Sequence, residues 1–343
     1  MKILENYDLK NLNTFGIPAK AEFFVEIKNE AELSELLKDP VFLENEKLFL
    51  GEGSNVLFTK DFNGIVVLNK IKGIEILEEN STSVLVKAKS GVIWHDLVSF
   101  AVDRDYWGIE NLALIPGTVG AAPMQNIGAY GAELKNVLEG VEAYDINNGE
   151  KKFFNKEECS FGYRDSIFKN SLKNKYFIFS ITLALSKIEK KNLNYKILRE
   201  HLEKNEIEVK SSKDVSDAVS EIRRSKLPDP KVIGNAGSFF KNVFVQEEKL
   251  KELLKLYPEM PFFKEDGLSK IPSAWLIEQC GPAKGTSWKG YRVGNVGVHH
   301  KQALVLVNHG DANGAEIKEL ALQIIISVKE KFDLELVPEV NLI

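Results

Sequence analysis

Two glycine-rich segments, residues 51–55 and 115–131, carry the residue types best suited to bind phosphate groups. Glycine lets main-chain N–H groups approach an anion closely and permits a positive φ, so such turns form concave anion sites. The chain has no Lys or Arg between Arg104 and Lys135. Main-chain amides and neutral side chains would hold a pyrophosphate here, which suits a permanently bound dinucleotide. The predicted cofactor-binding residues are Gly51, Gly53, Ser54, Asn55, Gly117, Thr118, Gly120, Ala121, Gln125 and Asn126.

The alternative interpretation of these segments is a pair of tight turns at which stretches of backbone pack closely. For residues 51–55 taken alone that interpretation is favoured, because Val56 stands where the third glycine of the Rossmann fingerprint belongs. The longer run 108–131 is rich in Gly, Ala and Pro and reads as structureless. Such a run inside a compact domain is usually functional.

The absence of several motifs excludes particular kinds of catalytic site. The sequence has no Gly-Lys dipeptide, no HExxH and no GxSxG, which excludes a Walker A loop, that zinc motif and a nucleophile elbow. The five histidines are not spaced as metal ligands, so we expect no metal site. The net charge is -5 with both signs interspersed, so we expect no nucleic-acid partner.

The sequence also predicts a soluble cytoplasmic protein. Cys159 and Cys280 lie far apart and form no CxxC pattern, as expected in a reducing compartment. The N-terminal residues contain no apolar leader. Long apolar stretches such as 177–185 fall short of the roughly 20 residues that span a bilayer, so we expect no membrane insertion.

Short elements alternate along the chain and predict a mixed α+β architecture. A chain of 343 residues exceeds one typical core, and we expect boundaries near residues 75 and 215. Apolar periodicity and caps predict the elements. We expect helices at 29–38, 93–106, 214–226 and 314–331, strands at 47–50, 64–68 and within 141–183, a hairpin at 73–89 and a final strand at 334–342.

Collinear motifs from residue 13 to residue 340 resemble the UDP-N-acetylenolpyruvoylglucosamine reductase family. They are NTFGI (13–17), GEGSN (51–55), IPGTVGAAPMQNIGAYG (115–131), FGYRDSIFK (161–169), KLPDP (226–230), GNAGSFFKN (234–242), AWLIEQCG (274–281), VHHKQALVLVN (298–308) and VPEV (337–340). The region of Tyr195 and the spacing from KLPDP to GSFFKN resemble the longer of two family subtypes.

The resemblance implies an FAD-binding domain of the vanillyl-alcohol-oxidase (PCMH) type, made of two α+β subdomains, plus a separate α+β substrate-binding domain. On this chain the subdomains would comprise 1–75 joined by 334–343, then 76–214, with the substrate domain at 215–333. The C-terminal strand would carry Glu339 back toward the flavin. A monomer is the family expectation.

The implied reaction uses bound FAD and NADPH to reduce the enolpyruvyl group of UDP-N-acetylglucosamine enolpyruvate to UDP-N-acetylmuramate, in peptidoglycan synthesis. Hydride added to the terminal carbon creates a dianionic enolate, which needs positive charge at the carboxylate and a proton donor at carbon. By motif match, Arg164 would hold the carboxylate and Ser238 would deliver the proton. Glu339 would hydrogen-bond the same acid group as the neutral acid, or act through its pairing with Arg164.

Each of these residues has an ordinary alternative when read alone: an ion pair for Arg164, a turn for Ser238 and a solvated strand edge for Glu339. Only the resemblance selects them. It also implies a set of substrate-binding residues, with Lys226 and Tyr195 at the UDP diphosphate. The set is Tyr130, Tyr163, Tyr195, Lys226, Asn242, Lys270 and Gln302.

Phe262 stands where this subtype would carry a tyrosine, so one substrate hydrogen bond would be lost. The His299–His300 pair is interpreted as structural. No separate NADPH motif is present, as expected if NADPH and the UDP-sugar use one pocket in turn. Two rival functions stay open: a flavoprotein oxidase on the same fold, and a non-catalytic module that senses FAD or a UDP-sugar.

Overall fold

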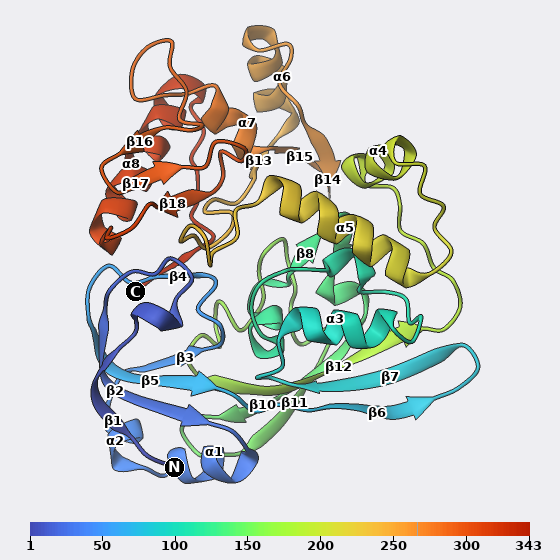
Figure 1. Cartoon of the computed structure of the whole chain (residues 1–343), viewed down its shortest axis with the longest axis vertical. Coiled ribbons are helices and arrows are strands. Elements are labelled where there is room, and N and C mark those ends of the chain that lie inside the picture. Colours follow the sequence, from blue (N-terminus) through green and yellow to red (C-terminus); the bar gives the residue numbers. More distant parts are fainter. Residues whose placement is uncertain (266) are drawn as a thin grey trace. The chain divides into compact units, whose positions relative to one another are not determined.

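The computed structural model describes residues 1–265 and 267–343, and its contacts divide the chain into two compact units (Figure 1). The first unit contains Met1–Tyr7, Ala21–Glu52 and Phe62–Ser225. The second unit contains Asp8–Lys20, Gly53–Asp61 and Lys226–Ile343. The predicted division into three domains stays a prediction, although the last segment of the second unit begins at Lys226 and not near residue 215.

A four-stranded sheet in the order β1-β2-β5-β3 opens the first unit. Its strands are β1 (Leu4–Asp8), β2 (Lys20–Ile27), β3 (Lys47–Leu50) and β5 (Phe62–Asn69), and β5 runs parallel to both β2 and β3. The apolar run of β5 is almost fully buried, as parallel strands covered on both faces require. The predicted strands at 47–50 and 64–68 are confirmed.

Two short helices accompany this sheet, α1 (Glu30–Leu36) and α2 (Pro40–Glu44). Asn29 caps α1 by accepting a hydrogen bond from the Glu32 main chain at 2.9 Å. The Glu32 carboxylate in turn accepts the main-chain N–H of Lys28 at 2.7 Å. The predicted helix at 29–38 is therefore confirmed and begins with this cap, although α1 ends at Leu36.

A five-stranded antiparallel sheet forms the rest of the scaffold, in the order β11-β10-β12-β7-β6. The predicted hairpin 73–89 is confirmed, and the Asn80 side chain organises its turn by accepting from the main chains of Thr82 and Ser83. The strands are β6 (Ile74–Glu79), β7 (Ser83–Lys89), β10 (Leu138–Asp145), β11 (Lys151–Asn155) and β12 (Tyr176–Ser186).

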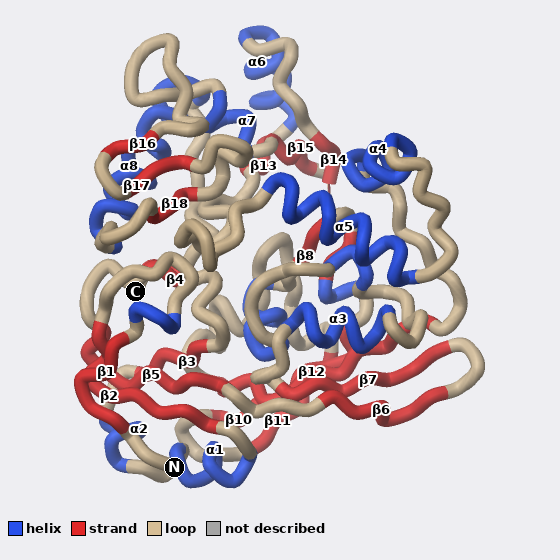
Figure 2. The backbone as a smooth tube through the Cα atoms, in the orientation of Figure 1, coloured by secondary structure: helices blue, strands red, loops and turns tan. Residues whose placement is uncertain are grey.

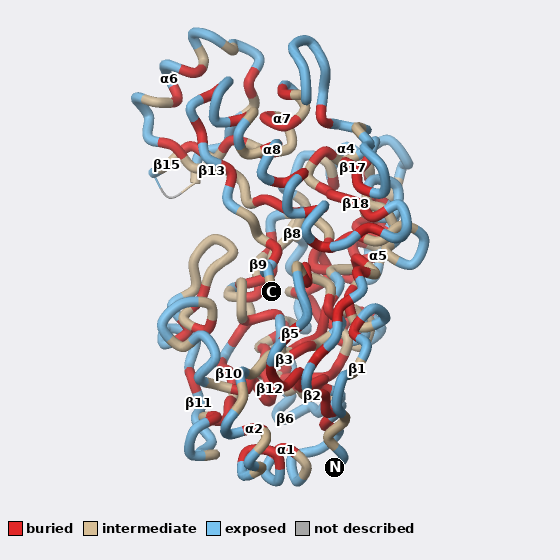
Figure 3. The backbone as a smooth tube through the Cα atoms, turned by 90° about the vertical axis from the view of Figure 1, so that its left-hand side faces the viewer, coloured by how far each residue is buried: buried red, intermediate tan, exposed pale blue. Residues whose placement is uncertain are grey.

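Helices α3 (Trp94–Val102), α4 (Lys196–Lys204) and α5 (Ser212–Lys226) share one apolar core with this sheet. Figure 2 shows α3 and α5 on the same side of the strands, and Figure 3 shows the buried stretches of β10 and β12. The core joins Val98 of α3, Val219 of α5 and Ile181 of β12. A second cluster joins Val25, Leu36 and Phe179, which connects the two sheets.

The helix predicted at 93–106 ends earlier, at Val102. Asp105 takes a left-handed φ of 53°, and the Tyr106 N–H returns to the Ala101 carbonyl at 2.9 Å. This left-handed turn ends the helix, a feature that apolar periodicity does not reveal. The helices predicted at 214–226 and 314–331 are confirmed as α5 and α8 (Gly314–Phe332).

The run 108–131, predicted as structureless, is built from short regular pieces. It contains the 3-10 helices η2 (Glu110–Leu112) and η3 (Val119–Gln125), and its hairpin strand β8 (Gly128–Ala129) pairs with β9 (Ala132–Glu133). A further 3-10 turn, η4 (Leu134–Asn136), follows. Small residues allow these pieces to pack closely, so the prediction of an irregular loop is wrong.

Among its described residues, the second unit contains two small antiparallel sheets and three α-helices. One sheet holds β13 (Val243–Val245), β15 (Leu268–Ile271) and β14 (Phe263–Glu265), and the other holds β16 (Arg292–Val293), β17 (Val296–Val298) and β18 (Leu306–Asn308). The helices are α6 (Glu247–Leu256), α7 (Ser273–Glu278) and α8, and a 3-10 turn, η1 (Lys10–Leu12), belongs to the same unit.

The final strand is shorter than predicted. Only β19 (Asn341–Leu342) is a strand, and it pairs in parallel with β4 (Val56–Leu57). Upstream, Pro338 forms an isolated bridge with Phe240. Proline offers no N–H to a ladder, which interrupts regular pairing there. Within the described residues, no helix combines the length and apolarity that a membrane crossing needs.

Candidate active site

In the second unit, the glycine-rich turn at Gly53 is braced by residues 9–17. Gly53 has a φ of 63°, and a Cβ there would collide with the Leu12 carbonyl oxygen. The Thr14 N–H donates to the Gly53 carbonyl at 3.1 Å. Asn13 stabilises the brace by donating to the Leu9 and Ile17 carbonyls, each at 2.9 Å. The NTFGI motif is thus a scaffold for this turn.

The main-chain N–H groups of Gly53 and Ser54 donate to no acceptor among residues 1–265 and 267–343. Unpaired amides in a turn with a left-handed glycine form a concave anion site. This part of the turn therefore fits a phosphate of a dinucleotide such as FAD.

We expect Gly53→Ala to destabilise the protein far more than Gly16→Ala. Gly16 has nearly the same φ, 65°, but open space around its Cβ position. The left-handed φ alone costs about 1–2 kcal/mol, and the collision at Gly53 adds about 1–3 kcal/mol more. Chemical denaturation and FAD content measure the difference, and equal losses for the two variants would contradict the close approach to Leu12.

In the first unit, the other glycine-rich segment is tied to Gly51 and Glu52. A Cβ at Gly51 would collide with the Thr118 hydroxyl oxygen. The Glu52 carboxylate accepts the Gly117 N–H at 2.8 Å. Glu52 was missed in the sequence interpretation, although its place inside GEGSN was an available signal.

Within the first unit, main-chain hydrogen bonds occupy some of the amides of this segment and leave another open. The Gly120 N–H donates to the Ser90 carbonyl at 2.9 Å, and the Ala121 N–H donates to the Thr118 carbonyl at 3.0 Å. The Thr118 N–H donates to no acceptor in the described part of the chain. Among Gly117, Thr118, Gly120 and Ala121, Thr118 therefore has the amide open to a cofactor.

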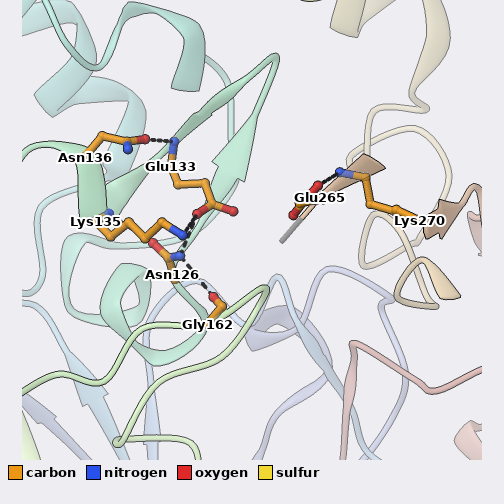
Figure 4. A network of polar contacts seen from close by, with 7 residues as sticks. All are labelled: Asn126, Glu133, Lys135, Asn136, Gly162, Glu265 and Lys270. Carbon is orange, nitrogen blue, oxygen red and sulfur yellow. Dashed lines mark hydrogen bonds and ion pairs between the residues drawn. The ribbon is translucent and has the colours of Figure 1, made fainter. Parts of the chain in front are cut away.

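Asn126 joins the end of this segment to the turn that carries Arg164 (Figure 4). Its side chain is fully buried and donates to the Glu133 carboxylate at 3.0 Å and to the Gly162 carbonyl at 3.1 Å. Its carbonyl oxygen accepts the Lys135 N–H at 3.0 Å. Both amide hydrogens are occupied, so the contacts of this side chain are structural ones within the first unit.

Arg164 itself lies in a tight turn with a left-handed φ of 51°. Its guanidinium donates to the Gly128 carbonyl and lies 5.3 Å from the centre of the Tyr163 ring. The buried Ser166 hydroxyl donates to the Met124 carbonyl at 2.8 Å and pins the far end of the turn. The predicted cofactor segment and the predicted arginine are therefore neighbours within one unit.

Two predicted substrate residues, Tyr130 and Tyr195, are in contact in the first unit. Their rings make an edge contact with centroids 5.3 Å apart. The Asn111 side chain donates to the Tyr130 and Asn192 carbonyls, each at 2.9 Å, and holds the two segments together. Burial raises the pKa of Tyr130 above its ordinary value.

In the second unit, the segments of Ser238 and Glu339 lie side by side. The Glu339 N–H donates to the Phe239 carbonyl at 2.8 Å, and the Lys241 N–H donates to the Val337 carbonyl at 2.9 Å. The Asn55 side chain donates to the Glu339 carbonyl at 3.3 Å. Ser238 is exposed, and its hydroxyl bonds to no other described residue. The fold therefore gathers Asn55, Ser238 and Glu339.

The other substrate candidates of the second unit occupy separate elements. Asn242 accepts the Ser273 N–H at 3.1 Å, and Gln302 accepts the Leu304 N–H at 3.4 Å. Lys270 of β15 forms an ion pair with Glu265 of β14 (Figure 4). Phe262 is 38% exposed, so the place expected for a tyrosine faces solvent. Lys226, the last residue of α5, is exposed.

Residues 229–343 match the UDP-N-acetylenolpyruvoylglucosamine reductase C-terminal domain, and residues 21–152 match the FAD binding domain family. A UDP-N-acetylenolpyruvoylglucosamine reductase from Amoebophilus asiaticus is 48% identical over 344 residues, which cover 100% of both chains. The chain belongs to the UDP-N-acetylenolpyruvoylglucosamine reductase family.

Other relatives agree with this membership. The reductases of Flavobacterium johnsoniae and Pseudomonas aeruginosa are 45% and 42% identical, covering 100% of this chain and 100% and 99% of theirs. The crystal structure of the Thermus caldophilus reductase aligns with a TM-score of 0.64 at 23% identity, covering 99% and 98% of the two chains. A solvent-stable cholesterol oxidase aligns with a TM-score of 0.50 at 10% identity, covering 98% of this chain and 86% of its own.

The expected fold class, an FAD-binding domain with a further α+β domain, is confirmed. The two solved structures bear on the fold alone. Family membership makes the chain an FAD-dependent oxidoreductase with NADPH as co-substrate. Within the second unit the unpaired amides of Gly53 and Ser54 suit a phosphate group, and within the first unit the amide of Thr118 does so. The described residues contain no cluster of His, Cys, Asp or Glu able to hold a metal.

Proposed function

We propose that this protein reduces the enolpyruvyl group of UDP-N-acetylglucosamine enolpyruvate to the lactyl ether of UDP-N-acetylmuramate, with NADPH as the reductant. Full-length identity to reductases of this name supports the reaction. The observation that carries it is the adjacency of the Ser238 and Glu339 segments, joined by the bond from Glu339 to Phe239. That adjacency supplies a hydroxyl and a carboxyl group for one reacting acid.

When bound, FAD would supply hydride-transfer chemistry, with NADPH as its reductant. Arg164 binds the carboxylate of the enolpyruvyl group and stabilises the negative charge that grows there, because a guanidinium keeps its charge and forks onto carboxylates. Glu339 hydrogen-bonds the same acid group. The Ser238 hydroxyl donates a proton to the carbon next to the carboxylate and regains one from solvent.

We propose that the amides of Gly53, Ser54 and Thr118 hold FAD, with Gly51, Gly117, Gly120 and Ala121 shaping the backbone around it. The side chains of Asn55 and Gln125 complete the predicted contacts. Asn126, whose amide hydrogens are occupied, contributes by positioning the Arg164 turn. Tyr130, Tyr163, Tyr195, Lys226, Asn242, Lys270 and Gln302 are proposed to bind the UDP-sugar.

A monomer in the cytoplasm is also proposed, together with the subdomains 1–75 with 334–343, 76–214 and 215–333. Two buried cysteines, Cys159 and Cys280, support a reducing compartment. Burial raises the pKa of the Cys159 thiol to about 12, so this thiol stays protonated and unreactive at neutral pH. Light scattering in solution tests the monomer.

We expect the purified protein to be yellow, to lose its flavin absorbance with NADPH under anaerobic conditions, and to regain it when UDP-N-acetylglucosamine enolpyruvate is added. Stopped-flow absorbance measures both steps. Rapid reoxidation by oxygen without any response to the sugar nucleotide would support the rival oxidase. A colourless protein, or a flavin that NADPH does not reduce, would support the rival sensor.

A further inference from the structure

Arg223 of α5 is a partly buried cation that no predicted role explains. Its Nε is buried and has no hydrogen-bond partner. Its guanidinium forms no ion pair with any carboxylate of residues 1–265 and 267–343. Its neighbour Arg224 is exposed to solvent. A buried guanidinium nitrogen without a partner is unfavourable, because it has lost its hydration and gained no hydrogen bond in return.

Arg223 lies within electrostatic reach of two residues of the predicted site in the first unit, Tyr130 and Arg164. Ile222, the preceding residue, is part of the apolar cluster against which Tyr130 packs. Loss of hydration lowers the pKa of Arg223, and the positive charge of Arg164 lowers it further. The charge of Arg223 in turn opposes the rise in the pKa of Tyr130. Arg223 therefore interacts electrostatically with both Tyr130 and Arg164.

Two arginines that repel each other at one site are stable together when an anion binds between them. The proposed reaction supplies such an anion. The substrate carries one negative charge on its carboxylate, and hydride addition at the terminal carbon turns this group into a dianionic enolate until Ser238 protonates it. One guanidinium balances one of these charges, and a second cation is needed for the other.

We propose that Arg223 is a second arginine of the substrate-acid site, which binds the enolpyruvyl carboxylate together with Arg164 and balances the charge that follows hydride addition. This inference rests on the proposed function. The fork of a guanidinium suits a carboxylate, and a single lysine would supply the charge without the two parallel hydrogen bonds.

The test compares Arg223→Met, Arg223→Lys and the control Arg224→Met in the FAD-loaded enzyme. Flavin absorbance reports the Kd of UDP-N-acetylglucosamine enolpyruvate, and that of UDP-N-acetylglucosamine, which lacks the acid. We expect Arg223→Met to raise the Kd of UDP-N-acetylglucosamine enolpyruvate by about 10- to 100-fold, which corresponds to the loss of one charge-assisted hydrogen bond. Binding of the acid-free nucleotide should stay within about twofold, Arg223→Lys should recover part of the loss, and Arg224→Met should match the parent.

Equally weakened binding of both nucleotides would overturn the proposal, because Arg223 would then bind the nucleotide portion that the two ligands share. Unchanged binding with a shifted flavin midpoint potential would also overturn it, because Arg223 would then face the cofactor. FAD content and thermal unfolding identify a variant that fails to fold, for which Arg223→Lys is the milder substitute. Failure of the parent enzyme to oxidise its reduced flavin with the substrate would instead reject the proposed function.

Discussion

Replacement of Ser238 by alanine is expected to slow reoxidation of the reduced flavin by the UDP-sugar by about 10²–10⁴-fold, the usual contribution of a positioned proton donor. Reduction of the flavin by NADPH should keep its rate, because that step requires no proton at the substrate carbon. Ser238 is exposed and its hydroxyl bonds to no other described residue, so removal of the hydroxyl breaks no internal hydrogen bond. Stopped-flow measurement of the two half-reactions separates these effects.

The control for this prediction is Ser238→Cys, whose thiol can also donate a proton. We expect it to restore part of the rate lost in Ser238→Ala, and the loss in the alanine variant to persist at saturating substrate. Equal slowing of both half-reactions would contradict a proton-donor role and would point to a distorted active site.

Replacement of Arg164 by methionine should slow the same half-reaction by about 10²–10³-fold, as loss of one group that stabilises a developing charge does. Substrate binding should weaken as well, since the carboxylate loses its guanidinium. Arg164→Lys keeps the charge but loses the forked geometry, so we expect its rate and its substrate affinity to lie between those of the parent enzyme and Arg164→Met. Rapid mixing and substrate titration measure the rate and the Kd.

The structure also gives Arg164 a local role, because its guanidinium donates to the Gly128 carbonyl. FAD content and unfolding temperature must therefore accompany the kinetics. Arg104→Met is a matched control, since Arg104 is an exposed arginine of the same unit that donates to the Phe100 carbonyl at 3.1 Å. An Arg164→Met enzyme with the parent's rate of substrate reduction would remove Arg164 from the mechanism.

Much of the fold follows from local sequence signals. The helix that Asn29 caps and the hairpin that turns at Asn80 are both formed as predicted. The errors lie where apolar periodicity carries no signal. The helix from residue 94 stops at the left-handed turn of Asp105, and Pro338 interrupts the pairing of the C-terminal segment.

The candidate site was likewise predictable from the sequence only in part. Motif resemblance selected Arg164, Ser238 and Glu339, whose residue types alone favoured ordinary roles. It did not reveal Glu52, whose carboxylate holds the Gly117 N–H, nor Arg223, which lies in no glycine-rich or polar motif. Nor did it show that the Asn126 side chain is occupied within the first unit.

The sequence by itself determined the family, the cofactor class and most of the helices and strands, because these depend on short-range periodicity, caps and collinear motifs. Only the tertiary structure decided which amides stay open and how the second unit is assembled. Bonds that join Thr59 to Ile343 and Asn55 to Glu339 link residues 284 positions apart. Hydrogen-bond satisfaction and desolvation depend on such distant neighbours, and no local pattern specifies them.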